Sequence, residues 1–387
     1  MSSCKFIPLS VPNLKGNELQ YVTNAVETEW VSTAGPYVAD FEKSIAQYAG
    51  VPGAVACQSG TAGLHISLLL CGVTSADAVI VPTLTFIAAV NPVRYIGAEP
   101  LFMDCDDSLC MDPVKLEAFC REQCEIRGDA LYHKASGKRV PALVVVHVFG
   151  NMADMEQILD IADRYHFKVV EDATEAIGTR YTSGRFNGKY AGTMGTVGVY
   201  SFNGNKIITT GGGGMIVSND EALLKEAKHL TTQAKADEAN FIHDEIGYNY
   251  RLTNLQAALG LAQMEQLESF IEIKAKNYKL YRTLLDGAPG LKLLPFREGI
   301  RTNHWFYSLY LEDSFPLRPA ELIGKLKENS IQSRPIWGLI HEQAPYHGSR
   351  TWQIEKAKTY WEHVVNLPCS TNLTEEDVRR VADVILR

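Results

Sequence analysis

Short apolar segments alternate with helical segments through the first 218 residues, and this alternation constrains the fold more than any other feature. Seven apolar runs are candidate strands, at residues 54–57, 78–81, 100–104, 142–147, 168–171, 197–201 and 215–218. Between them, residues 61–71, 86–95, 113–122 and 154–165 have the apolar periodicity of helices. Strands that alternate with helices form a largely parallel sheet covered on both faces. The sequence therefore predicts an α/β fold.

The pattern changes after about residue 249. Thr253 and Asn254 precede a long helical run, to about residue 285, with apolar residues recurring on one face. Beyond it we expect a strand near 305–312 and helices near 319–329, 352–363 and from 375. With 387 residues, the chain is long enough for two domains. We predict a large domain at residues 1–250 and a small C-terminal α+β domain at residues 251–387 that includes the bridging helix.

A lysine in a loop of small residues is the first candidate functional residue. Lys206 follows the predicted strand 197–201 and precedes four glycines at 211–214. An amine presented in this way can bond covalently to an aldehyde, and pyridoxal phosphate is the obvious candidate. Taken alone, the same lysine also fits a solvated side chain at a turn.

A carboxylate ends the predicted strand at residues 168–171. Pyridoxal phosphate enzymes place a carboxylate opposite the pyridine nitrogen, because a protonated ring withdraws electrons better than a neutral one. Asp172 fits that role, and it would also fit the N-cap of a following helix. Glu175 could contact the ring hydroxyl of the cofactor or lie on the surface.

The turn Ser59-Gly60-Thr61-Ala62 lies between the predicted strand 54–57 and an apolar helix. Free amides and hydroxyls at such a helix start bind anions, so this turn is the candidate phosphate site. Ser59 or Thr61 would also serve as an ordinary N-cap. The glycine strings of dinucleotide-binding and P-loop proteins do not occur in the sequence, which weighs against a nucleotide-dependent oxidoreductase.

Together these segments resemble the DegT/DnrJ/EryC1/StrS family of sugar aminotransferases, from about residue 7 to the end of the chain. The strings that carry the resemblance are residues 30–36, 59–62, 82–86, 147–150, 171–173, 201–206 and 247–251. The family implies the aspartate aminotransferase-like fold, fold type I of pyridoxal phosphate-dependent transferases. It also implies a homodimer whose active site is shared between subunits.

The resemblance assigns roles to residues of this chain. Lys206 would bond to pyridoxal phosphate and Asp172 would pair with its ring nitrogen. The expected cofactor-binding residues are Ser59, Gly60, Thr61, Ala62, Phe86, Asp172, Glu175, Ser201, Asn203, Lys206 and Asn249. Phe86 would stack on the ring, and Asn249 would reach the phosphate from the neighbouring subunit. Relatives often have Gln or His at the position of Glu175, so this carboxylate has to share a hydrogen with the cofactor or stay solvated.

The resemblance further narrows to LegC-like enzymes of legionaminic acid and bacillosamine synthesis, which aminate C4 of a UDP-linked 4-keto-6-deoxy-N-acetylhexosamine. The strings that carry it are residues 6–19, 203–210, 232–234 and 334–337, with the polar stretch 122–139. Glutamate would donate the amino group through the pyridoxamine phosphate form and leave as 2-oxoglutarate. The alternatives are a GDP- or dTDP-linked keto sugar, as in perosamine synthesis, or a sugar dehydratase. Related dehydratases carry His where this chain has Lys206, which favours transamination.

Substrate-binding candidates follow from the same resemblance and from the charge of a nucleotide sugar. They are Trp30, Ser32, Phe86, Arg185, Tyr307, Arg334 and Trp337, with Lys189, Arg251 and His304 as further bases. Each aromatic residue among them could equally be a core residue. The pKa of Lys206 should be lowered by cationic or electron-poor neighbours, because a free base is needed for proton transfer.

Composition narrows the class of protein. Acidic residues exceed basic ones by 45 to 37, which argues against nucleic-acid binding. The eight cysteines include no CxxC pair, and Cys120 and Cys124 lack a partner pair, so we expect no metal site. The start of the sequence lacks the apolar core of a signal peptide, and no run of 18 apolar residues exists, which predicts a cytoplasmic protein. A regulator without turnover is disfavoured because Lys206 and Asp172 are both present.

Overall fold

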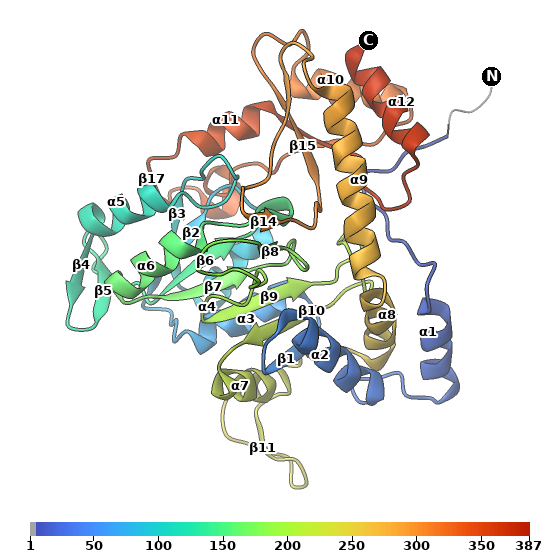
Figure 1. The fold of residues 1–387 in the computed structure, drawn as a ribbon. Coiled ribbons are helices and arrows are strands. Elements are labelled where there is room, and N and C mark those ends of the chain that lie inside the picture. The colour runs from blue at the N-terminus through green and yellow to red at the C-terminus, as the bar shows by residue number, and fades with distance from the viewer. Residues whose placement is uncertain (1–4) are drawn as a thin grey trace.

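A mixed, mostly parallel sheet forms the centre of the molecule. The computed structural model describes residues 5–387, and Cys4 lies outside the described residues. Eight strands are arranged in the order β1-β10-β9-β7-β6-β2-β3-β17, with helices on both faces (Figure 1). Strand β10 runs in the opposite direction to the other seven strands of this sheet. The predicted largely parallel α/β sheet is confirmed.

All seven predicted strands are present in this sheet. They are β1 (Gly53–Cys57), β2 (Ala78–Pro82), β3 (Glu99–Met103), β6 (Ala142–Val146), β7 (Lys168–Asp172), β9 (Val197–Ser201) and β10 (Gly214–Ser218). Three predicted helices correspond to α3 (Gly60–Leu70), α5 (Pro113–Gln123) and α6 (Met155–Tyr165). The helix expected at 86–95 is instead a 3-10 turn, Ile87–Ala89, followed by α4 (Asn91–Ile96). Pro92 explains this break, because its ring and missing N–H prevent a helix from continuing through it.

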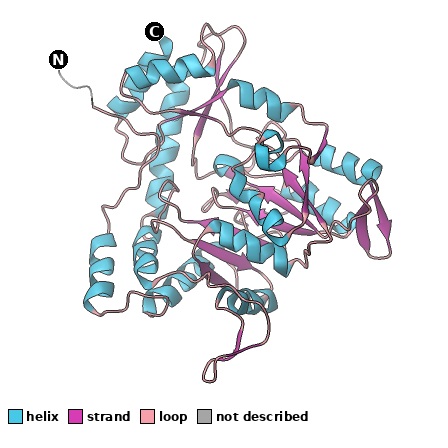
Figure 2. Cartoon of the chain, turned by 180° about the vertical axis from the view of Figure 1, so that it is seen from behind, coloured by secondary structure: helices cyan, strands magenta, loops and turns pink. Residues whose placement is uncertain are grey.

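Several further helices and hairpins surround the large sheet that were not predicted from the sequence. Helices α1 (Glu18–Glu27) and α2 (Pro36–Ala49) both pack against α8 (Asn254–Met264). The polar stretch 122–139 contains a hairpin of β4 (Cys124–Arg127) and β5 (Ala130–His133). A second hairpin, β11 (Lys235–Asp237) with β12 (Ile242–His243), follows α7 (Glu221–Thr231) and projects from the body in both views (Figures 1 and 2).

The bridging helical run is two helices, α8 and α9 (Leu267–Leu285), with a break at residues 265–266. Thr253 and Gln256 form a capping box at the start of α8. The C-terminal part then forms an antiparallel sheet in the order β13-β15-β18-β16. Its elements are β13 (Leu291–Leu293), β15 (Tyr307–Leu311), α10 (Pro319–Glu328), β16 (Arg334–Pro335), α11 (Lys356–His363), β18 (Val364–Leu367) and α12 (Glu375–Leu386).

Segments that precede residue 250 pair with segments that follow it. Strand β17 (Arg350–Trp352) pairs in parallel with β3 at the edge of the large sheet. Ile7 pairs with Ile331, and the Cys369 N–H donates to the Leu9 carbonyl at 2.8 Å. The division into domains at residue 250 therefore stays a prediction, while the packed core is continuous from Ile7 to Ile385. Within residues 5–387, no helix has both the length and the apolar character needed to span a membrane.

Close packing of α3 on the sheet gives a stability prediction. A Cβ on Gly63 would lie 2.7 Å from Val199 Cγ1 of β9. We expect Gly63→Ala to lower the free energy of unfolding by up to about 2 kcal/mol, because overpacking at roughly 1–3 kcal/mol exceeds the helix-propensity gain of about 1 kcal/mol. Gly324 in α10 has no atom within 4 Å of such a Cβ.

The matched substitution Gly324→Ala should therefore raise the free energy of unfolding by on the order of 1 kcal/mol. Urea denaturation of both variants measures the two effects. Equal shifts of the same sign would contradict the packing argument.

Candidate active site

A cavity of about 620 Å³ lies at the carboxyl ends of β1, β2, β7 and β9. In open α/β sheets this edge is where ligands bind, because the loops that leave the strands meet there. Here the loops bring Ser59, Phe86, Asp172 and Ser201 to the same cavity. Residues of the C-terminal part, among them Trp305, close it from the other side.

The start of α3 forms an anion-binding end of the cavity. Ser59 is the N-cap, and its Oγ accepts from the Ala62 N–H at 3.1 Å. The N–H groups of Gly60 and Thr61, the first two helical residues, have no acceptor within the helix. A Cβ on Gly60 would lie 2.9 Å from Thr174 Cγ2 and 3.0 Å from Ser201 Cβ, so only glycine allows this close approach. The arrangement fits a phosphate group.

The loop between β9 and β10 carries Lys206 and is held from several directions. The Lys206 N–H donates to the Asn203 carbonyl at 3.0 Å. The Asn205 carbonyl accepts from Trp305 Nε1 at 2.9 Å and from Ser10 Oγ at 3.1 Å. The loop is therefore fixed at the base of the lysine side chain by Trp305, just before β15, and by Ser10 of the N-terminal segment.

The amine of Lys206 lies among carboxylates. Its Nζ is 3.6 Å from Glu175 Oε1 and 4.0 Å from the centre of the Trp305 ring. Burial lowers the pKa of Lys206, while Glu175 and Asp172 act in the opposite direction. The pKa shift has the predicted direction, and removal from water is its largest cause. The predicted contribution of electron-poor neighbours stays a prediction.

Asp172 ends β7 with its carboxylate in the cavity. Oδ1 accepts from the Thr174 N–H at 3.0 Å. Burial raises the pKa of Asp172, and the Thr174 hydrogen bonds and Lys206 oppose that rise. No helix follows β7, since residues 173–179 form turns, so the N-cap explanation of this residue fails. A buried carboxylate at this place in the cavity is suited to pair with a protonated ring nitrogen.

Glu175 is buried at 4% exposure, which excludes the solvated alternative considered from the sequence. Its Oε2 accepts from the Phe149 N–H at 2.8 Å. Phe149 adopts a left-handed conformation, with φ 56°, that turns this N–H toward the carboxylate. Burial raises the pKa of Glu175 to about 7, so near neutral pH the group can both donate and accept a hydrogen bond.

Behind the cavity, a fully buried pair joins the ends of β6 and β7. Glu171 accepts from His147 Nε2 at 2.8 Å and from the N–H groups of Gly192 and Met194 at 2.8 and 2.6 Å. His147 Nδ1 accepts from the Ala153 N–H at 3.2 Å, so Nε2 carries the only ring proton and the imidazole is neutral. The His147 N–H also donates to the Asp172 carbonyl at 3.1 Å. Both residues lie in strings that carry the family resemblance, 147–150 and 171–173, but neither was predicted as a site residue.

Most predicted cofactor residues meet at the cavity. They are Ser59, Gly60, Thr61, Phe86, Asp172, Glu175, Ser201, Asn203 and Lys206, joined by the predicted substrate residues Arg334 and Trp337. Two cofactor predictions do not line it in a single chain. The Ala62 N–H is used by Ser59 Oγ, and Asn249 lies beside Arg251, whose Nη2 donates to Asn249 Oδ1 at 3.3 Å. Because Asn249 was predicted to act in the neighbouring subunit, that role stays a prediction.

Four predicted substrate residues lie outside the cavity. Arg185 forms a surface ion pair with Asp160 at 2.7 Å, and Tyr307 is fully buried. Its hydroxyl donates to the Lys274 carbonyl at 2.8 Å. The remaining two, Trp30 and Ser32, present their carbonyls to Asn254 at 2.7 and 2.6 Å. Of the further bases proposed from the sequence, Lys189, Arg251 and His304 are also absent from the lining.

An aromatic wall of the cavity was only partly foreseen. Phe149 packs against Trp337 with ring centroids 4.5 Å apart and against Phe306 at 5.4 Å. Trp305 completes this wall. The string 147–150 carried the family resemblance, and it was the available signal for Phe149.

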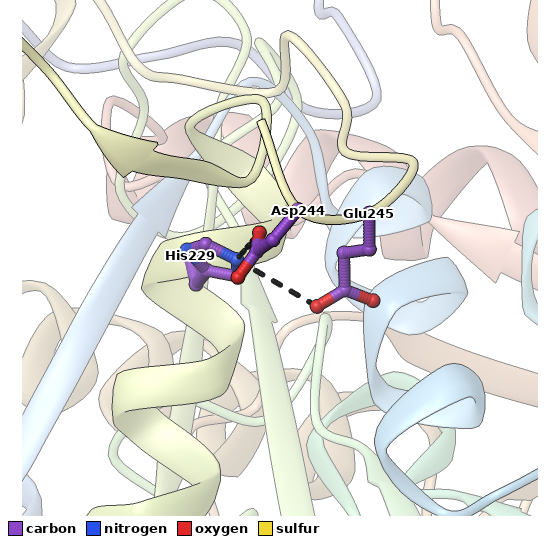
Figure 3. Close-up of side chains that lie close together, drawn as sticks. All are labelled: His229, Asp244 and Glu245. Carbon is purple, nitrogen blue, oxygen red and sulfur yellow. Dashed lines mark hydrogen bonds and ion pairs between the residues drawn. The ribbon is translucent and has the colours of Figure 1, made fainter. Parts of the chain in front are cut away.

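One group of possible metal ligands lies away from the cavity. His229 of α7 faces Asp244 and Glu245 of the loop after β12, with Nε2 to carboxylate distances of 2.8 and 3.6 Å (Figure 3). Both carboxylates are exposed, and the ion pairs to His229 account for the grouping. The seven cysteines within the described residues, Cys120 and Cys124 included, are buried free thiols.

Comparisons with known proteins agree with this geometry. The sequence model of the DegT/DnrJ/EryC1/StrS aminotransferase family matches residues 12–386. EpsN of Bacillus subtilis (strain 168), a proposed pyridoxal phosphate-dependent aminotransferase, is 36% identical over 387 residues, covering 99% of this chain and 95% of EpsN. The GDP-perosamine synthase of Caulobacter vibrioides is 35% identical over 384 residues, covering 98% of each. A crystal structure of a DegT DnrJ EryC1 StrS aminotransferase from Brucella abortus has a TM-score of 0.86 and 27% identity, covering 95% of this chain and 94% of that one.

The electrostatics of the site predict the reactivity of Lys206. In cofactor-free protein, its lowered pKa leaves more neutral amine at pH 8 than an ordinary lysine has, so an acylating reagent should modify it ahead of exposed lysines. Lys274 also has a pKa lowered by burial, but it is buried against the carbonyls of Trp305 and Cys369 and should stay unmodified. Peptide mass spectrometry over a pH series measures both rates.

Removing a carboxylate tests the cause of that shift. Glu175 raises the pKa of Lys206 against the effect of burial, so Glu175→Gln should move the midpoint of the labelling curve to lower pH. Asp172→Asn should move it in the same direction by less, because Asp172 is the weaker of the two influences. A midpoint that moves to higher pH in either variant would contradict this account.

Proposed function

This chain belongs to the DegT/DnrJ/EryC1/StrS aminotransferase family and is a pyridoxal phosphate-dependent nucleotide-sugar aminotransferase, and we propose that it aminates C4 of a nucleotide-linked 4-keto-6-deoxyhexose. The observation that carries the proposal is the buried amine of Lys206 between Glu175 and Asp172. Arg334 and Trp337 line the same cavity and are proposed to bind the nucleotide sugar.

We propose GDP as the nucleotide. The relative that makes GDP-perosamine, by its name, covers nearly all of this chain at 35% identity. The UDP-linked N-acetyl sugar expected from the sequence is the second candidate. Its support is the resemblance of residues 203–210 and 334–337 to LegC-like enzymes.

The chemistry divides between cofactor and protein. When bound, pyridoxal phosphate supplies an aldehyde and an electron-withdrawing ring, which together allow an amino group and a carbonyl to be exchanged. Lys206 Nζ, whose pKa burial lowers toward the range in which an amine accepts a proton, takes the proton from the α-carbon of glutamate. In the sugar half of the reaction, the same nitrogen delivers a proton to C4.

Other residues hold the reacting groups in place. The free amides at the start of α3 bind the cofactor phosphate, and the Asp172 carboxylate keeps the ring nitrogen protonated. Glu175 accepts a hydrogen bond from the Phe149 N–H and lies beside Lys206. Because burial raises the pKa of Glu175 to about 7, its carboxyl group can share a proton with a neighbouring oxygen atom. Trp305 and Phe149 exclude water from this side of the cavity.

We also propose a homodimer in which Asn249 completes the partner's cofactor site. Large apolar side chains exposed on the single chain support an interface, including Trp30 at 53%, Phe241 at 75% and Ile246 at 83%. Asn249 follows the segment that contains Phe241 and Ile246, and it lies outside its own chain's cavity.

The substrate proposal predicts the outcome of a panel experiment. Protein loaded with pyridoxal phosphate is incubated with glutamate and GDP-, UDP- or dTDP-linked 4-keto-6-deoxy sugars, and products are identified by mass and NMR. We expect amination of the GDP sugar with the highest kcat/KM. A higher kcat/KM for the UDP-N-acetyl sugar would contradict the GDP proposal and favour the second candidate.

The Lys206→Ala variant removes the amine that transfers the proton. It should reduce turnover of any substrate by roughly 10²–10⁴-fold or more.

Mixing two inactive variants tests the shared site. Lys206→Ala and Asn249→Ala homodimers should both be poorly active. Random subunit exchange gives heterodimers that contain one intact site if Asn249 acts across the interface, so activity should recover to about a quarter of the unmodified level. No recovery, with exchange verified by native mass spectrometry, would place Asn249 outside the partner's site.

A further inference from the structure

A second cavity, of about 560 Å³, shares no lining residue with the catalytic one. It is bounded by β8 (Arg180–Tyr181), β14 (Ile300–Arg301) and α9, which meet beside the large sheet (Figure 1). Its volume is close to that of the catalytic cavity, so it has room for a small organic molecule as well as for a bare ion.

Two arginines face one another across the short β8–β14 ladder. Arg180 pairs in register with Arg301. Like charges directly opposite each other repel, unless an anion lies between them. Glu268 neutralises Arg301 through two hydrogen bonds and also accepts from Tyr48 Oη at 2.6 Å, so its capacity is largely used.

Arg180 has no hydrogen-bonded partner in the protein. Its side chain makes no hydrogen bond or close ion pair with any of residues 5–387, its Nε is buried, and its nearest compensating charge is the already paired Glu268. Arg282 adds a third arginine to the lining, which also contains the carboxylates of Glu268 and Glu272. The cavity therefore offers a guanidinium whose planar donors suit a phosphate or a carboxylate.

His304 lines the same cavity and contributes a second unpartnered nitrogen just beneath its surface. Nδ1 of His304 is buried and has no hydrogen-bond partner among the described residues. Burial, with Lys274 and Arg301 nearby, lowers the pKa of His304 to about 4, so the ring is neutral. The ring packs against Tyr278 and Phe296 at centroid distances of 5.0 and 4.8 Å, which gives the cavity an aromatic side.

We propose that this cavity is a second ligand site, which binds a small molecule bearing a phosphate or carboxylate group. Its oxyanion pairs with Arg180, and His304 supplies a neutral hydrogen-bonding group beside it. Two polar groups that the fold leaves unsatisfied in one cavity then gain partners together.

The segment at residues 302–305 connects this cavity with the catalytic lysine. His304 lines the second cavity, and the next residue, Trp305, lies against Lys206. Asn303 Nδ2 donates to the carbonyls of Glu175 and Ile177, both at 2.9 Å. A ligand that moves His304 therefore acts on Trp305 and on the residue whose carboxylate faces Lys206. The proposal includes this coupling.

Binding to the pyridoxal phosphate-loaded protein tests the site. Calorimetry with inorganic phosphate and with citrate separates the phosphate and carboxylate sources. We expect at least one probe to bind, and its affinity to fall about tenfold or more in Arg180→Gln. It should be unchanged in Arg164→Gln, which removes an exposed arginine paired with Glu117, and in Arg334→Gln, which alters the catalytic cavity.

Failure of both probes to bind, equal affinity in Arg180→Gln, or loss of binding in Arg334→Gln would overturn the site. Thermal denaturation verifies that Arg180→Gln is folded, and Arg180→Lys, which keeps the charge, should bind with intermediate affinity. The 15N shift of His304 Nδ1 should change on saturation in the unmodified protein. If the two cavities are coupled, saturating the second cavity with the probe should shift the midpoint of the pH titration of the cofactor's absorbance. An unchanged midpoint with the probe bound would overturn the coupling.

Discussion

Three ionisable groups removed from water within one cavity are the constraint on which the rest of this structure depends. Lys206, Asp172 and Glu175 are each buried, and burial opposes the charged form of every one of them. The attraction of the Lys206 amine to the two carboxylates offsets part of this cost, while the carboxylates repel each other, so none of the three can be considered alone. Such a cluster persists only where the backbone around it is fixed.

The surrounding structure provides that rigidity through hydrogen bonds of buried polar groups. The His147–Glu171 pair holds the ends of β6 and β7, and the Phe149 N–H reaches Glu175 from a left-handed backbone conformation. A fully satisfied buried carboxylate such as Glu171 has no freedom to reorganise. The positions of Asp172 and Glu175 are thus determined by backbone N–H groups and by a buried pair behind the cavity.

A site residue could be predicted from the sequence when its position follows from its place at the end of a strand. Four site residues lie at or after the ends of strands, namely Ser59, Asp172, Ser201 and Lys206. The parallel sheet brings such strand ends to one edge, so the order of elements in the sequence was enough to predict that these residues meet. Trp30, Arg185 and Tyr307 carried no such positional information. Whether an aromatic or an arginine faces a cavity, the core or a surface carboxylate is decided by tertiary packing between distant segments. The same holds for β17, a three-residue strand whose place beside β3 no local pattern indicates.

Strand β17 also bears on how the chain folds during synthesis. The large sheet cannot gain its last strand until residue 352 has left the ribosome, and Leu9 cannot meet Cys369 until nearly the whole chain has emerged. Contacts of such long sequence separation close late and slow the search for the native state. The N-terminal segment therefore stays without these partners until residues 331 and 369 have been synthesised. Because Ser10 from that segment helps to hold the Lys206 loop, the active site is among the last parts of the molecule to become complete.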